Sequence, residues 1–136
     1  MPENLRVQSS EFIDETIRIS FKFNGKTYHG FKGDTLASAL LANNIHLIGR
    51  SFKYHRPRGI MTAGSEEPNA IVQVNDKTNR TEPNVRATEV EIYEGVEASS
   101  QNCWPSVNFD IGAINNFLKI FLIVVFYCKT LIWSTV

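Results

Sequence analysis

The segment from Gly49 to Gly59 holds the densest group of side chains that could bind a ligand. It reads GRSFKYHRPRG, with four cations, one histidine and two aromatic residues but no acid. Guanidinium groups bind phosphate in bidentate geometry, and an aromatic ring can stack on a nucleobase or a flavin. The composition indicates an anion site, although a solvated loop, or one paired with Glu66 and Glu67, explains it equally well. The cations that would form the site are Arg50, Lys53, Arg56 and Arg58.

Other residue types that could catalyse a reaction or bind a metal lack suitable partners. The three histidines, His29, His46 and His55, have neither cysteines nor paired carboxylates at metal-ligand spacing. The two cysteines, Cys103 and Cys128, are too few for an iron–sulfur cluster held by four thiolates. G-x-S-x-G and G-x-G-x-x-G, which are typical of hydrolases and dinucleotide-binding sites, do not occur. We therefore expect no catalytic residue and no metal site.

The charge balance narrows the choice of partners. The 136 residues include 14 basic and 14 acidic side chains, so the net charge is zero, although residues 1–58 are basic and 59–136 acidic. Because a general polyanion binder carries an excess of positive charge, we expect no nucleic-acid partner. The first residues, MPENLRVQSS, do not resemble a secretory signal, so we expect a cytoplasmic protein with free thiols.

A hairpin and a helix precede the basic segment. Apolar and polar residues alternate strictly from Ile17 to Phe23, as in a strand with one buried face. Asn24-Gly25 fits a type I′ turn, after which Lys26 to Gly30 returns as the second strand. Asp34 or Thr35 can cap the following helix, whose apolar face holds Leu36, Ala37, Leu40 and Leu41 and which Asn44 would end.

Two further strands are predicted after the basic segment, at Ala70 to Val74 and at Thr88 to Tyr93, because apolar and polar residues alternate again. The order of hairpin, helix and further strands indicates an α+β fold of the β-grasp type, in which a mixed sheet curls around one helix. This helix should pack on the hairpin.

The chain divides into three predicted regions. Residues 1–16 form an N-terminal arm, residues 17–97 the β-grasp domain, and residues 98–136 an apolar extension with only three charged side chains. The run from Ile120 to Cys128 is nine apolar residues long, whereas a bilayer span needs about 20. We therefore expect no membrane span, and an extension that packs against another domain.

Several strings in this sequence resemble the N-terminal region of the alpha subunits of heterotetrameric sarcosine oxidases. The resemblance covers about residues 17–118 in register. The resemblance implies a two-iron ferredoxin-like β-grasp domain, followed in the family by a nucleotide-binding region, in an enzyme that oxidatively demethylates sarcosine with FAD, FMN and NAD. The strings are NGKTYHGFKG (24–33), DTLASALLAN (34–43), GRSFKYHRPRGI (49–60) and AGSEEPNA (63–70).

The resemblance does not bring an iron–sulfur cluster with it. Ferredoxin-like relatives place cysteines as C-x4-C-x2-C with a distant fourth, because four thiolates must converge on two irons. In this sequence the triad falls near Thr62, Glu67 and Ala70, and the nearest cysteine is Cys103. The sarcosine oxidase alpha subunits that the chain resembles lack these ligands too. We therefore expect a ferredoxin-like fold without a cluster.

Together these inferences predict a non-catalytic structural and docking domain, a fragment or split subunit of a sarcosine oxidase-type flavin- and NAD-dependent oxidoreductase. We expect it to bind no cofactor alone and to assemble with the remaining subunits or domains. Its basic loop would contact a flavin or nucleotide phosphate, or an acidic partner surface. The alternative is a free-standing ubiquitin-like or polyanion-binding adaptor that uses residues 50–58.

Overall fold

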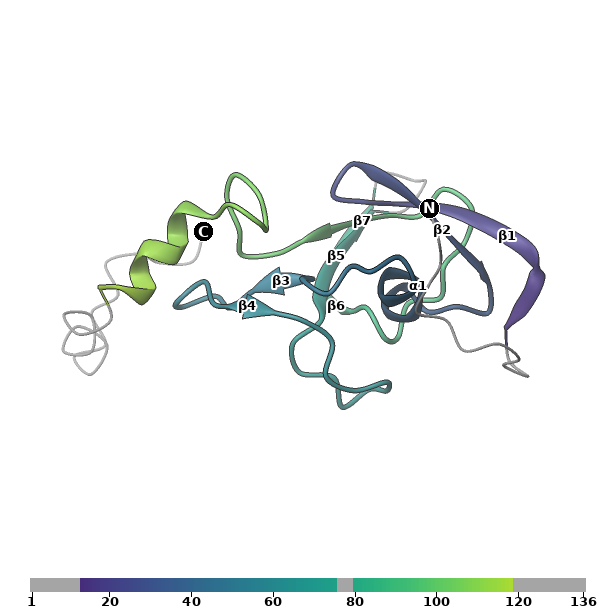
Figure 1. Cartoon of the computed structure of the whole chain (residues 1–136), viewed down its shortest axis with the longest axis horizontal. Coiled ribbons are helices and arrows are strands. Elements are labelled where there is room, and N and C mark those ends of the chain that lie inside the picture. Colours follow the sequence, from purple (N-terminus) through teal and green to yellow (C-terminus); the bar gives the residue numbers. More distant parts are fainter. Residues whose placement is uncertain (1–12, 76–79, 119–136) are drawn as a thin grey trace.

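A computed structural model describes residues 13–75 and 80–118, which form a five-stranded sheet and a separate two-stranded sheet (Figure 1). The large sheet has the strand order β2-β1-β7-β5-β6, with β1 and β7 parallel and the other neighbours antiparallel. The elements are β1 (Asp14–Phe23), β2 (Lys26–Lys32), α1 (Leu36–Ala42), β3 (Gly49–Arg50), β4 (Pro57–Arg58), β5 (Ile71–Asn75), β6 (Thr81–Arg86), β7 (Glu97–Ser100) and the 3-10 helix η1 (Ile111–Asn116).

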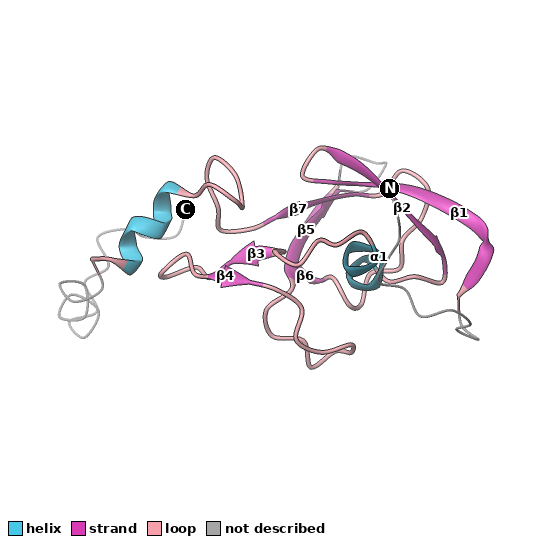
Figure 2. Ribbon diagram, in the orientation of Figure 1, coloured by secondary structure: helices cyan, strands magenta, loops and turns pink. Residues whose placement is uncertain are grey.

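The mixed sheet and the one α-helix found in the described part of the chain confirm the predicted α+β, β-grasp fold. Figure 2 shows α1 lying against the large sheet, while η1 lies beyond the end of the β3–β4 hairpin, away from that sheet. In the predicted hairpin, Asn24 and Gly25 have φ angles of 51° and 76°, as a type I′ turn requires. Phe23 pairs with Lys26 directly beside the turn, which fixes the register of both strands.

Residues before and after α1 fix its ends. Thr35 is the N-cap, and its side chain accepts a hydrogen bond of 3.2 Å from the Ser38 N–H. The neighbouring Asp34 is buried and accepts hydrogen bonds from the Phe31 N–H and the Ser38 hydroxyl. Asn43 ends the helix, and Asn44 follows with a φ angle of 60°. Both predicted capping residues thus contribute to the turn that starts α1.

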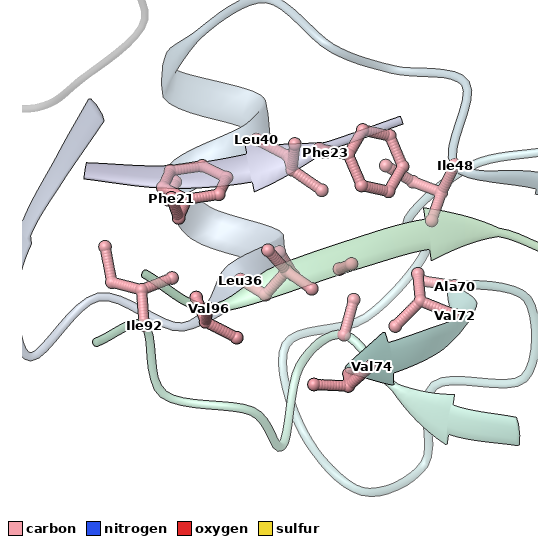
Figure 3. Packing of buried hydrophobic residues seen from close by; sticks show 14 residues of the cluster. Phe21, Phe23, Leu36, Leu40, Ile48, Ala70, Val72, Val74, Ile92 and Val96 are labelled. Atoms are coloured by element: carbon pink, nitrogen blue, oxygen red, sulfur yellow. The ribbon is translucent and has the colours of Figure 1, made fainter. Parts of the chain in front are cut away.

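The hydrophobic core lies between α1 and the inner face of the large sheet (Figure 3). Phe21 and Phe23 from β1 point toward α1, which buries Leu36 and Leu40. Burial of each such side chain contributes about 1.5–3 kcal/mol to stability. Gly30 allows the Ile92 side chain to approach β2 closely, because a Cβ at this position would lie 2.5 Å from the Ile92 Cδ1.

The predicted strand at Thr88 to Tyr93 is wrong. Residues 87–89 form a turn, and Glu91 makes only an isolated bridge to Thr35. Val90 and Ile92 nevertheless pack on the core, because the extended chain after the turn still alternates its side chains between core and solvent. Periodicity alone cannot tell such a segment from a strand that has found a partner.

Two strands of the large sheet, β6 and β7, were not predicted because they lack an apolar alternation. β6 pairs with β5, but it contains Pro83 and its side chains are almost all exposed. β7 is only four residues long and lies between β1 and β5 in the sheet. Of its side chains only that of Ala98 is buried. Because β7 begins at Glu97, the sheet runs past the predicted boundary at residue 97; the three-part division of the chain stays a prediction.

Among the described helices, none combines the length and apolar character needed to cross a bilayer. The apolar run from Ile120 to Cys128 lies outside the described residues.

Candidate functional site

The basic loop, residues 50–58, is a short hairpin in which β3 and β4 pair as Gly49 with Arg58 and Arg50 with Pro57. Ser51 closes the connection, because its N–H donates to the Arg56 carbonyl and its carbonyl accepts from the His55 N–H. His55 has a φ angle of 53°, a left-handed conformation that turns the chain back toward β4. The cations are therefore held on an ordered hairpin.

The buried carboxylate of Asp110 joins this hairpin to the segment before η1. Its side chain has no exposed surface, and its Oδ2 lies 2.7 Å from the His55 Nδ1 and 3.6 Å from the Arg50 Nε. Its Oδ1 accepts hydrogen bonds from the N–H groups of Trp104, at 3.0 Å, and Gly112, at 3.2 Å. A Cβ at Gly112 would overlap the His55 ring, so a glycine is needed at this approach.

The surroundings of Asp110 favour its charged form. Burial alone opposes ionisation, but the Trp104 N–H, the hydrogen bond and charge of His55, and the Gly112 N–H together outweigh it. The pKa of Asp110 is consequently lower than its ordinary value. The acid that pairs with the basic loop is thus Asp110, 55 residues after His55 in the sequence, and not Glu66 or Glu67.

The Arg50 side chain is mostly buried and forms hydrogen bonds within the protein. Its Nε donates to the Val107 carbonyl at 2.8 Å and its Nη1 to the His55 carbonyl at 2.8 Å. Its Nη2 lies 3.4 Å from the Asn108 carbonyl, and only 10% of the side chain is exposed. The guanidinium therefore holds the backbone that follows β7 against the basic loop, which leaves little of it for an external anion.

The other three predicted cations lie on the surface. Arg56 lies over the Tyr54 ring, 4.9 Å from its centroid, with the Lys53 ammonium 5.5 Å from the same centroid. Arg56 also donates to Asn116 at the end of η1. Arg58 donates instead to the Asn69 side chain, beside a shallow hollow of about 260 Å³. The structure thus gathers Lys53 and Arg56 around one ring and places Arg58 with other neighbours.

The apolar segment, residues 104–118, leaves large hydrophobic side chains in solvent. Phe117 is 81% exposed, and Trp104 and Phe109 are each 69% exposed. Asp110 belongs to this segment. Its buried carboxylate fixes the backbone that carries these side chains, because it accepts hydrogen bonds from the Trp104 and Gly112 N–H groups. Large apolar side chains that gather on an anchored segment mark a surface that meets another molecule or domain.

Loop 61–70 contains another buried carboxylate, that of Glu67, which is 0% exposed. Its Oε2 accepts hydrogen bonds from the N–H groups of Met61, at 2.7 Å, and Thr62, at 2.6 Å. Its Oε1 accepts from the N–H groups of Asn69, at 2.7 Å, and Ala70, at 3.1 Å. Burial opposes the charge, but these four donors prevail and lower the pKa of Glu67 from 4.5 to about 2.

The residues of loop 61–70 do not fit a two-iron cluster. The three positions expected for cysteine ligands, Thr62, Glu67 and Ala70, do meet in this loop, but none supplies a thiolate. The Cys103 thiol lies near the Ser100 carbonyl, and burial raises its pKa. Within residues 13–75 and 80–118, no group of three or more His, Cys, Asp or Glu side chains could hold a metal ion.

Comparison with known proteins identifies the class of domain. Residues 16–103 match the family described as "2Fe-2S iron-sulfur cluster binding domain". The chain belongs to this family, in agreement with its sheet order and with the meeting of the ligand positions in one loop. In fold it is similar to L-proline dehydrogenase from P. horikoshii, with a TM-score of 0.53 and 24% identity over 71% of this chain and 18% of that chain.

The curated relatives are subunits of one kind of enzyme. Sarcosine oxidase subunit alpha of Rhizobium meliloti (strain 1021) is 57% identical over 128 residues, which is 94% of this chain and 13% of the relative. The corresponding subunit of Corynebacterium sp. (strain U-96) is 39% identical over 89 residues, or 64% of this chain and 9% of the relative. The resemblance found in the sequence is therefore confirmed, and the chain spans about a tenth of these relatives.

Replacing Asp110 by Asn should loosen the basic loop from the apolar segment. The amide carries no charge to pair with Arg50 and His55, its NH₂ group faces the Arg50 Nε–H donor, and its neutral oxygen is a weaker acceptor for the two backbone N–H groups, so we expect a loss of about 1–3 kcal/mol in unfolding free energy. Hydrogen exchange should quicken at the Trp104 and Gly112 amides, which donate to the carboxylate. The exposed Glu89→Gln variant is the control, and unchanged exchange in Asp110→Asn would contradict the assignment.

The Glu67 carboxylate should make the stability of the chain depend on acid pH. Because its pKa in the folded state is about 2, below the ordinary 4.5, its stabilisation is full above pH 4.5 and is lost as the pH falls toward 2. The shift corresponds to about 3 kcal/mol. Urea denaturation at several pH values should show this loss in the native chain and a flatter profile in Glu67→Gln. An equal pH dependence of the unfolding free energy in the two chains would refute the stabilising role of the Glu67 carboxylate.

Proposed function

We propose that this chain is a non-catalytic structural and docking domain of a sarcosine oxidase-type oxidoreductase. The observation that carries the proposal is the apolar segment, whose exposed side chains are held in place by the buried Asp110. An isolated domain gains nothing from fixing exposed Phe109 and Phe117 in this way, whereas a domain inside a larger enzyme buries them against its neighbour.

The relatives support a larger assembly as that neighbour. The two sarcosine oxidase alpha subunits are much longer than this chain, which matches only 13% and 9% of them. We infer that the partners are the remaining subunits or domains of such an enzyme, in the cytoplasm. By resemblance, the whole enzyme would oxidatively demethylate sarcosine with FAD, FMN and NAD, cofactors that this chain alone does not bind.

The basic loop supplies a second, polar contact. The exposed cations of the hairpin are Lys53, Arg56 and Arg58. Arg50 fixes the position of this hairpin by donating hydrogen bonds to the Val107 and His55 carbonyls. Arg50 therefore has a positioning role, and the other three cations make the contact. They would meet a flavin or nucleotide phosphate, or an acidic surface of a partner subunit.

The docking role can be tested in a chimera. The matching 128-residue segment of the Rhizobium meliloti subunit is replaced by residues of this chain, and its assembly with the other subunits is measured by size-exclusion chromatography with light scattering. The double variant Phe109→Ser/Phe117→Ser should weaken assembly about tenfold or more, because two large apolar side chains lose their burial.

Ile17→Ser is the matched control, because Ile17 is also an exposed hydrophobic residue but lies on β1, far from the apolar segment in the sequence. It should leave assembly unchanged. Undiminished assembly of the double variant would reject docking through the apolar segment.

The contact through the basic loop is tested by Lys53→Gln/Arg56→Gln/Arg58→Gln in the same chimera. We expect at least a tenfold weaker assembly, or a loss of flavin, since charge-assisted hydrogen bonds contribute about 1.5–3 kcal/mol each. Lys22→Gln/Lys26→Gln/Lys32→Gln removes the same charge from exposed positions on the hairpin of β1 and β2. The contact is rejected if both triple variants behave alike.

The alternative function is a free-standing polyanion-binding adaptor. Steeply salt-dependent binding of the isolated chain to polyanions would favour this alternative.

A further inference from the structure

Loop 61–70 surrounds a buried charged group, the carboxylate of Glu67. Among the described residues, no lysine, arginine or histidine forms an ion pair with the Glu67 carboxylate; Arg86 reaches only the Glu67 backbone carbonyl, at 3.2 Å. A buried carboxylate is costly unless hydrogen bonds replace its water. Here the replacement comes from the backbone, through four N–H groups of the same loop.

The donors are divided evenly between the two carboxylate oxygens. Met61 and Thr62 donate to Oε2, which lies also 3.3 Å from the Thr62 hydroxyl, while Asn69 and Ala70 donate to Oε1. Each oxygen of a carboxylate accepts about two hydrogen bonds, so the acceptor capacity is filled. An amide in the same place would turn its NH₂ group toward two donors. The loop is therefore matched to an anion with two equivalent oxygens.

The same loop is where the family would place its cluster. Thr62, Glu67 and Ala70 occupy the C-x4-C-x2-C positions, and the loop is closed from the other side by the buried Thr88, whose hydroxyl donates to the Gly64 carbonyl at 2.8 Å. An iron–sulfur cluster is held by thiolates and accepts hydrogen bonds at its sulfurs. Without thiolates, the loop keeps inward-facing N–H groups that need another acceptor.

We propose that loop 61–70 is an oxyanion-binding site whose ligand is the chain's own Glu67 carboxylate, which closes the loop in place of a cluster. The class of ligand that fits the site is a small carboxylate. Removal of the Glu67 side chain should therefore leave four converging N–H donors that an added carboxylate can occupy.

The test is chemical rescue of Glu67→Ala in the full 136-residue chain. This substitution deletes Cγ, Cδ and both oxygens, which correspond to the four heavy atoms of acetate. The melting temperature of the variant should lie below that of the native chain. It should then rise with sodium acetate, by on the order of 5 °C when acetate is well above its dissociation constant.

The controls separate site binding from general effects of salt. Sodium chloride at equal ionic strength and neutral acetamide should not rescue Glu67→Ala, and Glu66→Ala should not respond to acetate. Glu67→Gln already fills the space, so acetate should leave it unchanged. Hydrogen exchange at the Met61, Thr62, Asn69 and Ala70 amides should slow with acetate in Glu67→Ala only.

Three results would overturn the proposal. The first is a Glu67→Ala chain as stable as the native one without any carboxylate. The second is equal stabilisation by chloride or acetamide. If Glu67→Ala does not fold in plain buffer, refolding is attempted in acetate and in chloride, and failure in both is the third.

Discussion

The structure depends on satisfying carboxylates that the chain has taken out of water. Glu67 fixes both ends of loop 61–70 through backbone N–H groups, and this loop leads directly into β5. β5 in turn pairs with β7, the strand in the middle of the large sheet. An uncompensated charge at this point costs several kcal/mol, comparable to the net stability of a small domain. The path of the loop is therefore set by the Glu67 carboxylate, with the Thr88 hydroxyl bound to the Gly64 carbonyl.

Asp110 is a buried carboxylate that fixes a backbone segment in the second half of the chain, as Glu67 fixes loop 61–70. It also accepts from backbone N–H groups, but it adds His55 and Arg50, so it joins segments that are far apart in the sequence. The result is an anchored apolar segment beside an ordered basic loop. The apolar segment is thus joined to the basic loop through a polar cluster, and none of its residues belongs to the hydrophobic core cluster.

The elements governed by local rules could be predicted from the sequence. The hairpin and α1 follow from alternation, from Asn24-Gly25 and from Thr35, all within a few residues. β6 and β7 could not, because long-range pairing makes them strands while their own side chains are mostly polar or exposed. At the site, the cations were found, but the partner acid was not, although Asp110 stands almost alone as a charge in an apolar segment. The sequence suggests Glu67 as a partner of the basic loop, whereas its place in the C-x4-C-x2-C register indicates the inward-facing side chain that the structure has.

The position of Asp110 bears on where such a polypeptide can be divided. Among the described residues the sheet ends at Ser100, and a cut just after it would preserve every strand of this part of the chain. It would also leave Arg50 and His55 facing an empty site, with a mostly buried guanidinium deprived of its acid and of the Val107 carbonyl. The smallest unit that keeps Arg50, His55 and Asp110 together therefore extends at least to Gly112, beyond β7.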